Sequence, residues 1–135
     1  MGIEILSNDM LDGIFKNTYR HYLVGAFQEA SLKDDNIEVG ISNYRSFTYD
    51  MPHYHPRVTE YQYVIAGESA LFDISNDRVY HLKQGDFFIV KPNTHYAEKH
   101  KSNTKVLFFK FPGENDKILI EVSYSIEMWL KDEVF

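Results

Sequence analysis

The spacing of apolar residues changes after residue 36 and limits this chain to a small number of folds. From there onward apolar and polar side chains alternate, the period of two that is typical of half-buried β-strands. Short runs of this kind are separated by Gly, Asn, Asp and Pro at fairly regular intervals; they include IEVGISNYRSFTY, TEYQYVIAG, DFFIVKP and KVLFFKF. Ten Tyr and ten Phe favour the same structure, because aromatic side chains pack well on pleated surfaces. We predict an all-β fold, an antiparallel sandwich or barrel, over residues 37–113.

The sequence predicts two tight turns between these strands. ISNDRV at 74–79 and KQGDF at 83–87 contain Asn, Asp and Gly, which tolerate the backbone conformations that tight turns require. Each turn is expected to join neighbouring strands of one sheet.

The two flanking segments follow a different pattern. Residues 3–30 place apolar side chains every three or four positions, which predicts one or two short helices, capped by Ser7, Asn8 or Asp9. In the tail, KILIEVSY could form a strand, whereas SIEMWLKDEVF has helical spacing. At 135 residues the chain has room for one domain. We divide it into a short helical N-terminal arm at 1–36, the β-barrel at 37–113 and a C-terminal tail at 114–135.

Charge and composition exclude several classes of partner and site. Fourteen Lys and Arg against twenty Asp and Glu give a net charge of −6, a field that repels phosphate backbones, so we expect no nucleic-acid partner. The start of the chain lacks the pattern of a secretory signal, and no run of about eighteen apolar residues occurs. We therefore expect no membrane partner and a cytoplasmic location. Because there is no cysteine, any metal must be bound by nitrogen and oxygen.

The stretch HYHPRVTEYQYVIAG carries the candidate metal ligands. Residues two apart in a strand project to the same face about 7 Å apart, so the rings of His53 and His55 can converge on one ion. Glu60 follows after a possible turn at PRVT, and His95, after the strand GDFFIVKP, is the candidate third imidazole. This mixed set suits one divalent transition metal ion (Fe, Mn, Ni, Zn, Co or Cu), with positions open for substrate. The alternatives are a solvated hairpin and, for His95, a turn histidine packed on an adjacent tyrosine, Tyr96 or Tyr54.

The same stretch resembles the first motif of the cupin superfamily. That motif reads glycine, five residues, His-x-His, three or four residues, glutamate, six residues, glycine. It is matched by His53, His55, Glu60 and Gly67, whereas Phe47 stands in place of the leading glycine.

The second cupin motif is matched less closely. It reads glycine, five residues, proline, one residue, glycine, two residues, histidine, three residues, asparagine. Gly85, Pro92 and His95 resemble this frame, but the proline comes one residue late, the second glycine is absent and Lys99 occupies the asparagine position. The resemblance covers residues 37–111. It implies a single antiparallel β-barrel, the double-stranded β-helix related to the jelly roll.

The resemblance and the alternation of side chains together suggest a function. Gln62 shares the inward face with Glu60, which makes it a candidate for substrate binding. Arg45, on the strand before the motif, could bind a carboxylate or phosphate, and could equally point at solvent. We expect a metal-dependent isomerase, epimerase, lyase or dioxygenase. It would act on a small oxygen-rich molecule such as a sugar derivative or keto acid, with Glu60 as a catalytic proton carrier.

Two other functions are compatible with the same residues. The motif region also resembles the sugar-sensing half of arabinose-regulator type transcription factors, so the alternative is a non-catalytic cupin that binds a sugar. A third reading is a structural barrel whose ligands are empty. Because barrels of this family often pair through an outer sheet, we expect a homodimer.

Overall fold

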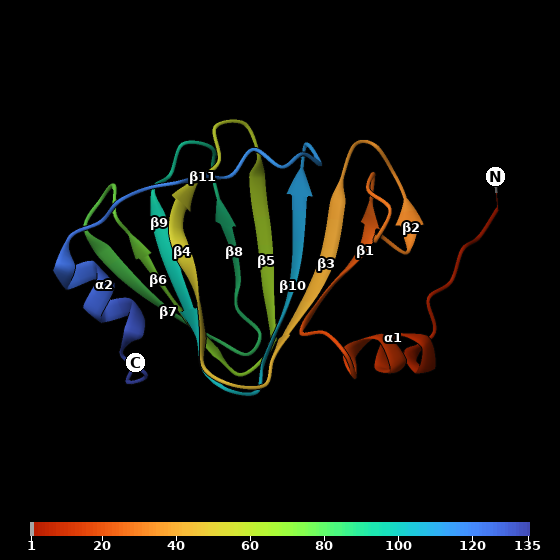
Figure 1. The fold of residues 1–135 in the computed structure, drawn as a ribbon, viewed down its shortest axis with the longest axis horizontal. Coiled ribbons are helices and arrows are strands. Elements are labelled where there is room, and N and C mark those ends of the chain that lie inside the picture. The colour runs from red at the N-terminus through yellow and green to blue at the C-terminus, as the bar shows by residue number, and fades with distance from the viewer. Residues whose placement is uncertain (1) are drawn as a thin grey trace.

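Two β-sheets face each other across the interior of the protein in the computed structural model, which describes residues 2–135 (Figure 1). The first sheet has the strand order β2-β1-β3-β10-β5-β8, with bounds Leu32–Lys33, Arg20–Gly25, Glu38–Tyr44, Thr104–Phe111, Thr59–Ala66 and Phe87–Val90. The second has the order β11-β4-β9-β6-β7, with bounds Ile118–Leu119, Thr48–Tyr54, Tyr96–His100, Glu68–Asp73 and Arg78–Lys83. The prediction of a mostly β fold is confirmed. A single closed antiparallel barrel is too specific, because the sheets are hydrogen-bonded separately and β1 pairs with β2 in parallel.

The alternation of side chains in β5 decides what faces the interior. Glu60, Gln62 and Val64 are buried, while Tyr63 on the opposite face is exposed. The strand then ends at Gly67, whose φ of +82° suits glycine, and a Cβ there would lie 2.3 Å from Thr104 Oγ1. The predicted turns after β6 and β7 are also present, and they include positive φ angles at Asp77 and Gly85.

The N-terminal arm is helical only at its start. Helix α1 (Asn8–Phe15) begins at Ser7, whose Oγ accepts from the backbone N–H of Met10 at 3.2 Å. Of the one or two helices expected over residues 3–30, only α1 is present, and residues 20–25 instead form β1 and pair antiparallel with β3. An uncovered β3 would present unpaired backbone groups at a sheet edge, and β1 satisfies them. This pairing also brings Arg20 into the interior.

The C-terminal tail ends in helix α2 (Tyr124–Lys131), as its spacing predicts, while only Ile118–Leu119 of the preceding run forms a strand. The helix lies against the second sheet, far from α1 in Figure 1, with the ring of Trp129 edge-on to Phe72. Lys99 projects from β9 and donates to the carbonyl oxygens of Trp129 and Asp132 at 2.7 and 2.8 Å. No helix within residues 2–135 has the length and apolarity needed to cross a membrane.

The interior between the sheets has an apolar part and a polar part. Leu71, Val90 and Tyr96 form a buried apolar cluster, against which Leu82 and Phe88 pack. Beyond the ring of Tyr96 the buried side chains become polar, and they line the cavity described next.

Candidate functional site

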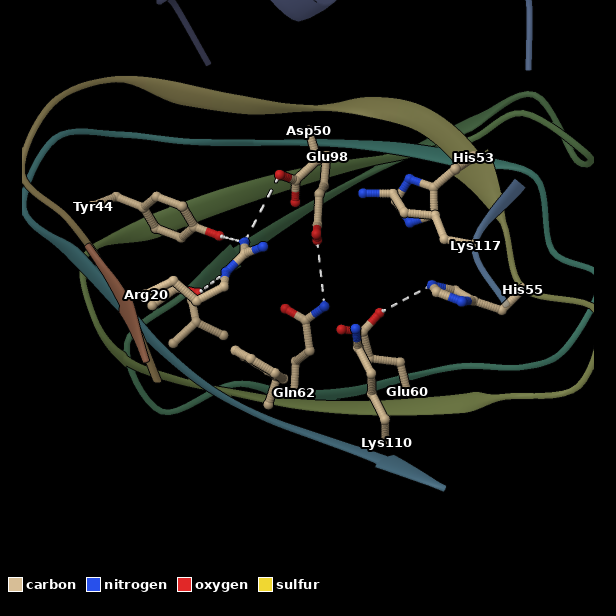
Figure 2. A pocket seen from close by; sticks show the side chains of 13 residues that line it. Arg20, Tyr44, Asp50, His53, His55, Glu60, Gln62, Glu98, Lys110 and Lys117 are labelled. Carbon is tan, nitrogen blue, oxygen red and sulfur yellow. Dashed lines mark hydrogen bonds and ion pairs between the residues drawn. The ribbon is translucent and has the colours of Figure 1, made fainter. Parts of the chain in front are cut away.

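A polar cavity of about 30 Å³ lies between the two sheets (Figure 2). Its charged and hydrogen-bonding lining comes from both sheets and from the segment that follows β10: Arg20, Ser42, Tyr44, Asp50, His53, His55, Glu60, Gln62, Glu98, Lys110 and Lys117. Burying so many polar groups is unfavourable unless they bind one another or a ligand. Buried polar groups in this cavity that lack a hydrogen-bond or ion-pair partner therefore indicate where a ligand binds.

The imidazoles of His53 and His55 are each oriented by a hydrogen bond behind the ring. Nδ1 of His53 lies 2.6 Å from the carbonyl oxygen of Met51, and Nδ1 of His55 lies 2.7 Å from Asp116 Oδ1. Because both acceptors require a proton on Nδ1, the tautomer that these hydrogen bonds select carries its Nε2 lone pair on the side of the cavity. Asp116 is held in turn by the backbone N–H groups of Arg57 and Val58, at 2.8 and 3.0 Å.

The hydroxyl group of Tyr96 contacts two hydrogen-bond acceptors, Glu60 and His53. The hydroxyl oxygen of Tyr96 lies 2.9 Å from Glu60 Oε2 and 3.0 Å from Nε2 of His53. Nε2 of His55 lies 3.9 Å from the same carboxylate oxygen. Tyrosine has a single hydroxyl proton, so either the carboxylate or the imidazole is left facing a lone pair. An additional positive charge among these atoms, a metal ion or a proton, would resolve the conflict.

Burial sets the protonation of these groups at neutral pH. Desolvation lowers the pKa of His53 to about 4, despite the opposing hydrogen bond to Met51. Desolvation, together with the charge of Glu60, raises the pKa of Tyr96 well above its usual value. The site therefore offers a neutral imidazole and a protonated phenol, and the neutral imidazole is the form that binds metals.

The donor set is chemically suited to a transition metal. Two imidazole nitrogens and one carboxylate are a common ligand combination for such ions. The donor atoms of His53, His55 and Glu60 do not all lie within 4.8 Å of one another. Binding one ion at bond lengths of about 2.0 to 2.2 Å thus requires these side chains to move inward.

A carboxyl pair occupies another part of the cavity, on the facing strands β4 and β9. Desolvation and the nearby charge of Asp50 raise the pKa of Glu98 well above its usual value. Burial alone would raise the pKa of Asp50 too, but the hydrogen bond from Glu98 and the charge of Arg20 hold it at about 2. Glu98 is therefore the protonated partner. Its Oε2 accepts from the amide of Gln62 at 3.5 Å.

Comparison with known proteins identifies the fold family. The family model described as a cupin domain matches residues 47–110. This chain contains a cupin domain. No curated protein sequence matches this cupin.

Solved structures similar to this cupin agree on the fold. An uncharacterized conserved protein with a double-stranded β-helix domain from Klebsiella pneumoniae has 22% sequence identity and a TM-score of 0.62, with 90% of this chain and 100% of that chain covered. The DMSP lyase DddQ from Ruegeria pomeroyi has 19% identity and a TM-score of 0.59, with 84% and 55% covered. The Streptomyces nucleoside dehydratase Pac13 has 18% identity and a TM-score of 0.56, with 68% and 75% covered.

The structure brings four of the six predicted site residues to the cavity of this cupin. His53, His55 and Glu60 line it as expected, and so does Gln62. His95 does not, because its half-exposed ring stacks on Tyr54 with a centroid separation of 4.5 Å. This is the turn-histidine alternative that the sequence left open.

Tyr96 occupies the place that was expected for His95. Counted strictly from Gly85, the second cupin motif puts its histidine at residue 96 and its asparagine at His100. The missing glycine of the motif then falls on Asn93, whose φ of +65° is the left-handed conformation that glycine would adopt. The spacing from Gly85 therefore indicates Tyr96 as the inward-facing residue. His95, one position earlier, was chosen instead because it is a histidine.

Arg45 also lies outside the cavity, and the arginine that lines the cavity is Arg20. Arg45 is exposed, and its guanidinium donates to the carbonyl oxygen of Phe15. Arg20 instead donates to Ser42 Oγ and to the hydroxyl of Tyr44, both at 2.8 Å. Sequence reasoning missed Arg20 because residues 20–25 were expected to be helical.

Proposed function

We propose that this cupin is a metal-dependent lyase that acts on a small, oxygen-rich anion by elimination. The observation that carries the proposal is the contact of one tyrosine hydroxyl with both a carboxylate and a neutral imidazole, beside a second imidazole with a free Nε2. This arrangement combines candidate metal ligands with a pair of groups able to exchange a proton.

The residues that would hold the metal are His53 and His55 through Nε2 and Glu60 through one carboxylate oxygen. Their outer hydrogen bonds, to Met51 and Asp116, fix the tautomer that a metal ligand needs. A divalent ion such as Fe, Mn, Ni, Zn, Co or Cu would supply a Lewis acid that polarises a substrate oxygen. Because Tyr96 stands where the cupin motif places a third imidazole, such an ion would have one protein ligand fewer, and a substrate oxygen could bind in its place.

Glu60 is the proposed base, and Tyr96 is the proposed acid. The carboxylate of Glu60 takes the proton from the carbon next to the substrate carboxylate, and the electron pair of that C–H bond forms the C=C bond. The hydroxyl group on the next carbon leaves as water after receiving the phenolic proton of Tyr96. The 2.9 Å contact between Tyr96 and Glu60 then returns the proton from the carboxyl group to the phenolate, so both residues are restored.

Three cations make an anionic substrate the best match for the cavity. Lys110 and Lys117 extend toward Glu60 and the two histidines in Figure 2, and Arg20 lies at the other end. Lys117 forms no ion pair within the described part of the chain, so its ammonium is available to a substrate carboxylate. A cavity of about 30 Å³ is smaller than a sugar acid, so only the reacting end enters unless the lysine side chains move.

The choice of a lyase over an isomerase, epimerase or dioxygenase has separate support. Two of the structurally similar proteins are named a nucleoside dehydratase and a DMSP lyase, and both names describe bond cleavage by elimination. The acid and base pair of this chain serves that chemistry without a further reactant.

The test is turnover of a substrate panel by protein loaded with each metal in turn. Hydroxy acids, uronates, keto acids and nucleosides are incubated in D₂O and followed by NMR, which detects both product and exchange of the proton beside the carboxylate. We expect elimination of at least one anion, with loss of turnover in Glu60→Gln. Arg45→Ala and His95→Gln are matched controls that remain active, because both side chains lie outside the cavity. Binding without exchange or turnover would favour the non-catalytic sugar-binding alternative and overturn the lyase proposal.

A further inference from the structure

A second group of potential ligands lies in the cavity, away from His53 and His55. One donor atom each from Asp50, Glu98 and His100 lie within 4.8 Å of one another. Asp50 and Glu98 are directly opposed in the pairing of β4 with β9, and His100 follows Glu98 by two residues on the same face. Three rigid strand positions thus aim two carboxyl groups and one imidazole at a common point.

His100 provides independent evidence that this point takes a ligand. Its side chain is 1% exposed, and Nε2 has no hydrogen-bond partner among the residues described. A buried ring nitrogen without a partner is unfavourable and rare in folded proteins. Nδ1 is engaged with Ser69 Oγ at 2.8 Å, so Nε2 is the nitrogen that remains free to bind.

The surroundings orient all three side chains. The ring of Tyr44 stacks on His100 with a centroid separation of 4.0 Å and an interplanar angle of 6°. Gln62 donates to Glu98, and Arg20 lies 3.8 Å from Asp50 Oδ1. Outer contacts to neighbouring side chains are what hold metal ligands in place.

We propose that Asp50, Glu98 and His100 form a second cation site, which binds a divalent transition ion such as Mn²⁺ or Zn²⁺ independently of His53 and His55. A mixed set of carboxylate and imidazole ligands suits these ions, and binding releases the proton that Glu98 carries in the metal-free protein. Two ligands bound at about 2.1 Å lie at most about 4.2 Å apart, so the three donors need to close only slightly. The charge of Arg20 opposes the incoming cation, so this site binds more weakly than one with two unopposed carboxylates.

The test is the stoichiometry of metal binding by the full-length protein. Protein stripped with a chelator is titrated with Mn²⁺ and followed by electron paramagnetic resonance, and its metal content is measured after dialysis against Zn²⁺. We expect two ions in the wild type. One ion should remain in the His53→Ala, His55→Ala double variant, and one in Asp50→Asn or His100→Gln. His81→Gln is the matched control, because this exposed histidine lies outside the cavity, and it should retain two ions.

Each outcome has a distinct meaning. A single ion in the wild type that disappears in the double variant would overturn the second site and leave the lyase proposal standing. A single ion that persists in the double variant but is lost in Asp50→Asn would support this site and overturn the metal ligands of the lyase proposal. Because Asp50→Asn preserves side-chain shape, it decides the matter if His100→Gln fails to fold. Two ions retained in Asp50→Asn, with unchanged affinity, would also overturn the second site.

Discussion

Tyr96 donates its hydroxyl proton to Glu60 Oε2 across 2.9 Å, from β9 in one sheet to β5 in the other. Both side chains are buried, so water does not compete for this hydrogen bond. The contact links the two sheets at the position where the cupin motif would place a histidine. It therefore makes tyrosine, rather than a third imidazole, the neighbour of the proposed metal.

Replacing Tyr96 with Phe tests its proposed role as the acid. We expect turnover to fall by about a hundredfold or more, which is typical for loss of a general acid. Stability should fall by only about 1 to 2 kcal/mol, because one buried hydrogen bond is lost. Metal content should not change. Tyr54→Phe is the control, since Tyr54 stacks on His95 outside the cavity. Turnover within threefold of the wild type in Tyr96→Phe would show that another group supplies the proton.

Acid should destabilise the metal-free protein through its buried histidines. Burial lowers the pKa of both His53 and His100 from 6.5 to about 4. Between these values the unfolded chain binds more protons than the folded one, so stability falls as the pH drops. The loss from pH 7 to pH 5 is about 2 kcal/mol per histidine. Urea denaturation in a chelator measures it as the difference in pH dependence between the wild type and His100→Gln, because the raised pKa of Glu98 acts in the opposite direction in both proteins. Equal pH dependence in the two proteins would contradict the assignment of a buried neutral ring to His100.

Lys99 should anchor the C-terminal helix to the second sheet. Its ammonium donates to the carbonyl oxygens of Trp129 and Asp132 and lies 4.3 Å from the centroid of the Trp129 ring. Lys99→Met should cost about 2 to 4 kcal/mol, because two charge-assisted hydrogen bonds are lost. Hydrogen exchange should increase across α2 but not across β5.

Lys101→Met provides the comparison for Lys99. Lys101 is paired with Glu68 at the surface, where an ion pair contributes little, so this variant should lose less than about 1 kcal/mol. Equal rates of hydrogen exchange across α2 in the two variants would show that Lys99 does not anchor this helix.

An apolar outer face on the first sheet supports the expected homodimer. Exposed apolar side chains of β5, β8 and β10 gather there: Tyr63, Phe87, Ile89 and Phe111. Such a patch marks an interaction surface more often than free surface. Light scattering should give a dimer for the wild type and a monomer for Ile89→Lys. Met128→Lys on α2 is the control, because Met128 is equally exposed but lies elsewhere. A monomeric wild type would contradict this prediction.

The sequence predicted those parts of the fold that local patterns determine. The period of two placed Glu60 and Gln62 on the inward face of β5, and Ser7 marked the start of α1. The strand β1 escaped prediction because its apolar spacing resembles a helix, and only the uncovered edge of β3 makes it a strand. Pairing between distant segments is a tertiary property that a local pattern does not contain.

The sequence predicted the motif residues of the candidate site, but not the other side chains that line the cavity. His53, His55 and Glu60 follow from spacing alone. Arg20 enters through the unpredicted β1, and Asp50 meets Glu98 only because β4 lies beside β9. His95 was predicted to line the site because it is a histidine close to the position that the second cupin motif specifies. The motif spacing from Gly85 leads instead to Tyr96.

Anomalous diffraction from a crystal grown with Mn²⁺ tests whether His53, His55 and Glu60 bind one metal ion. The proposed site predicts a peak about 2.0 to 2.3 Å from Nε2 of His53, Nε2 of His55 and a carboxylate oxygen of Glu60. No peak between these three side chains at full metal loading, or a peak only beside Asp50, would contradict it.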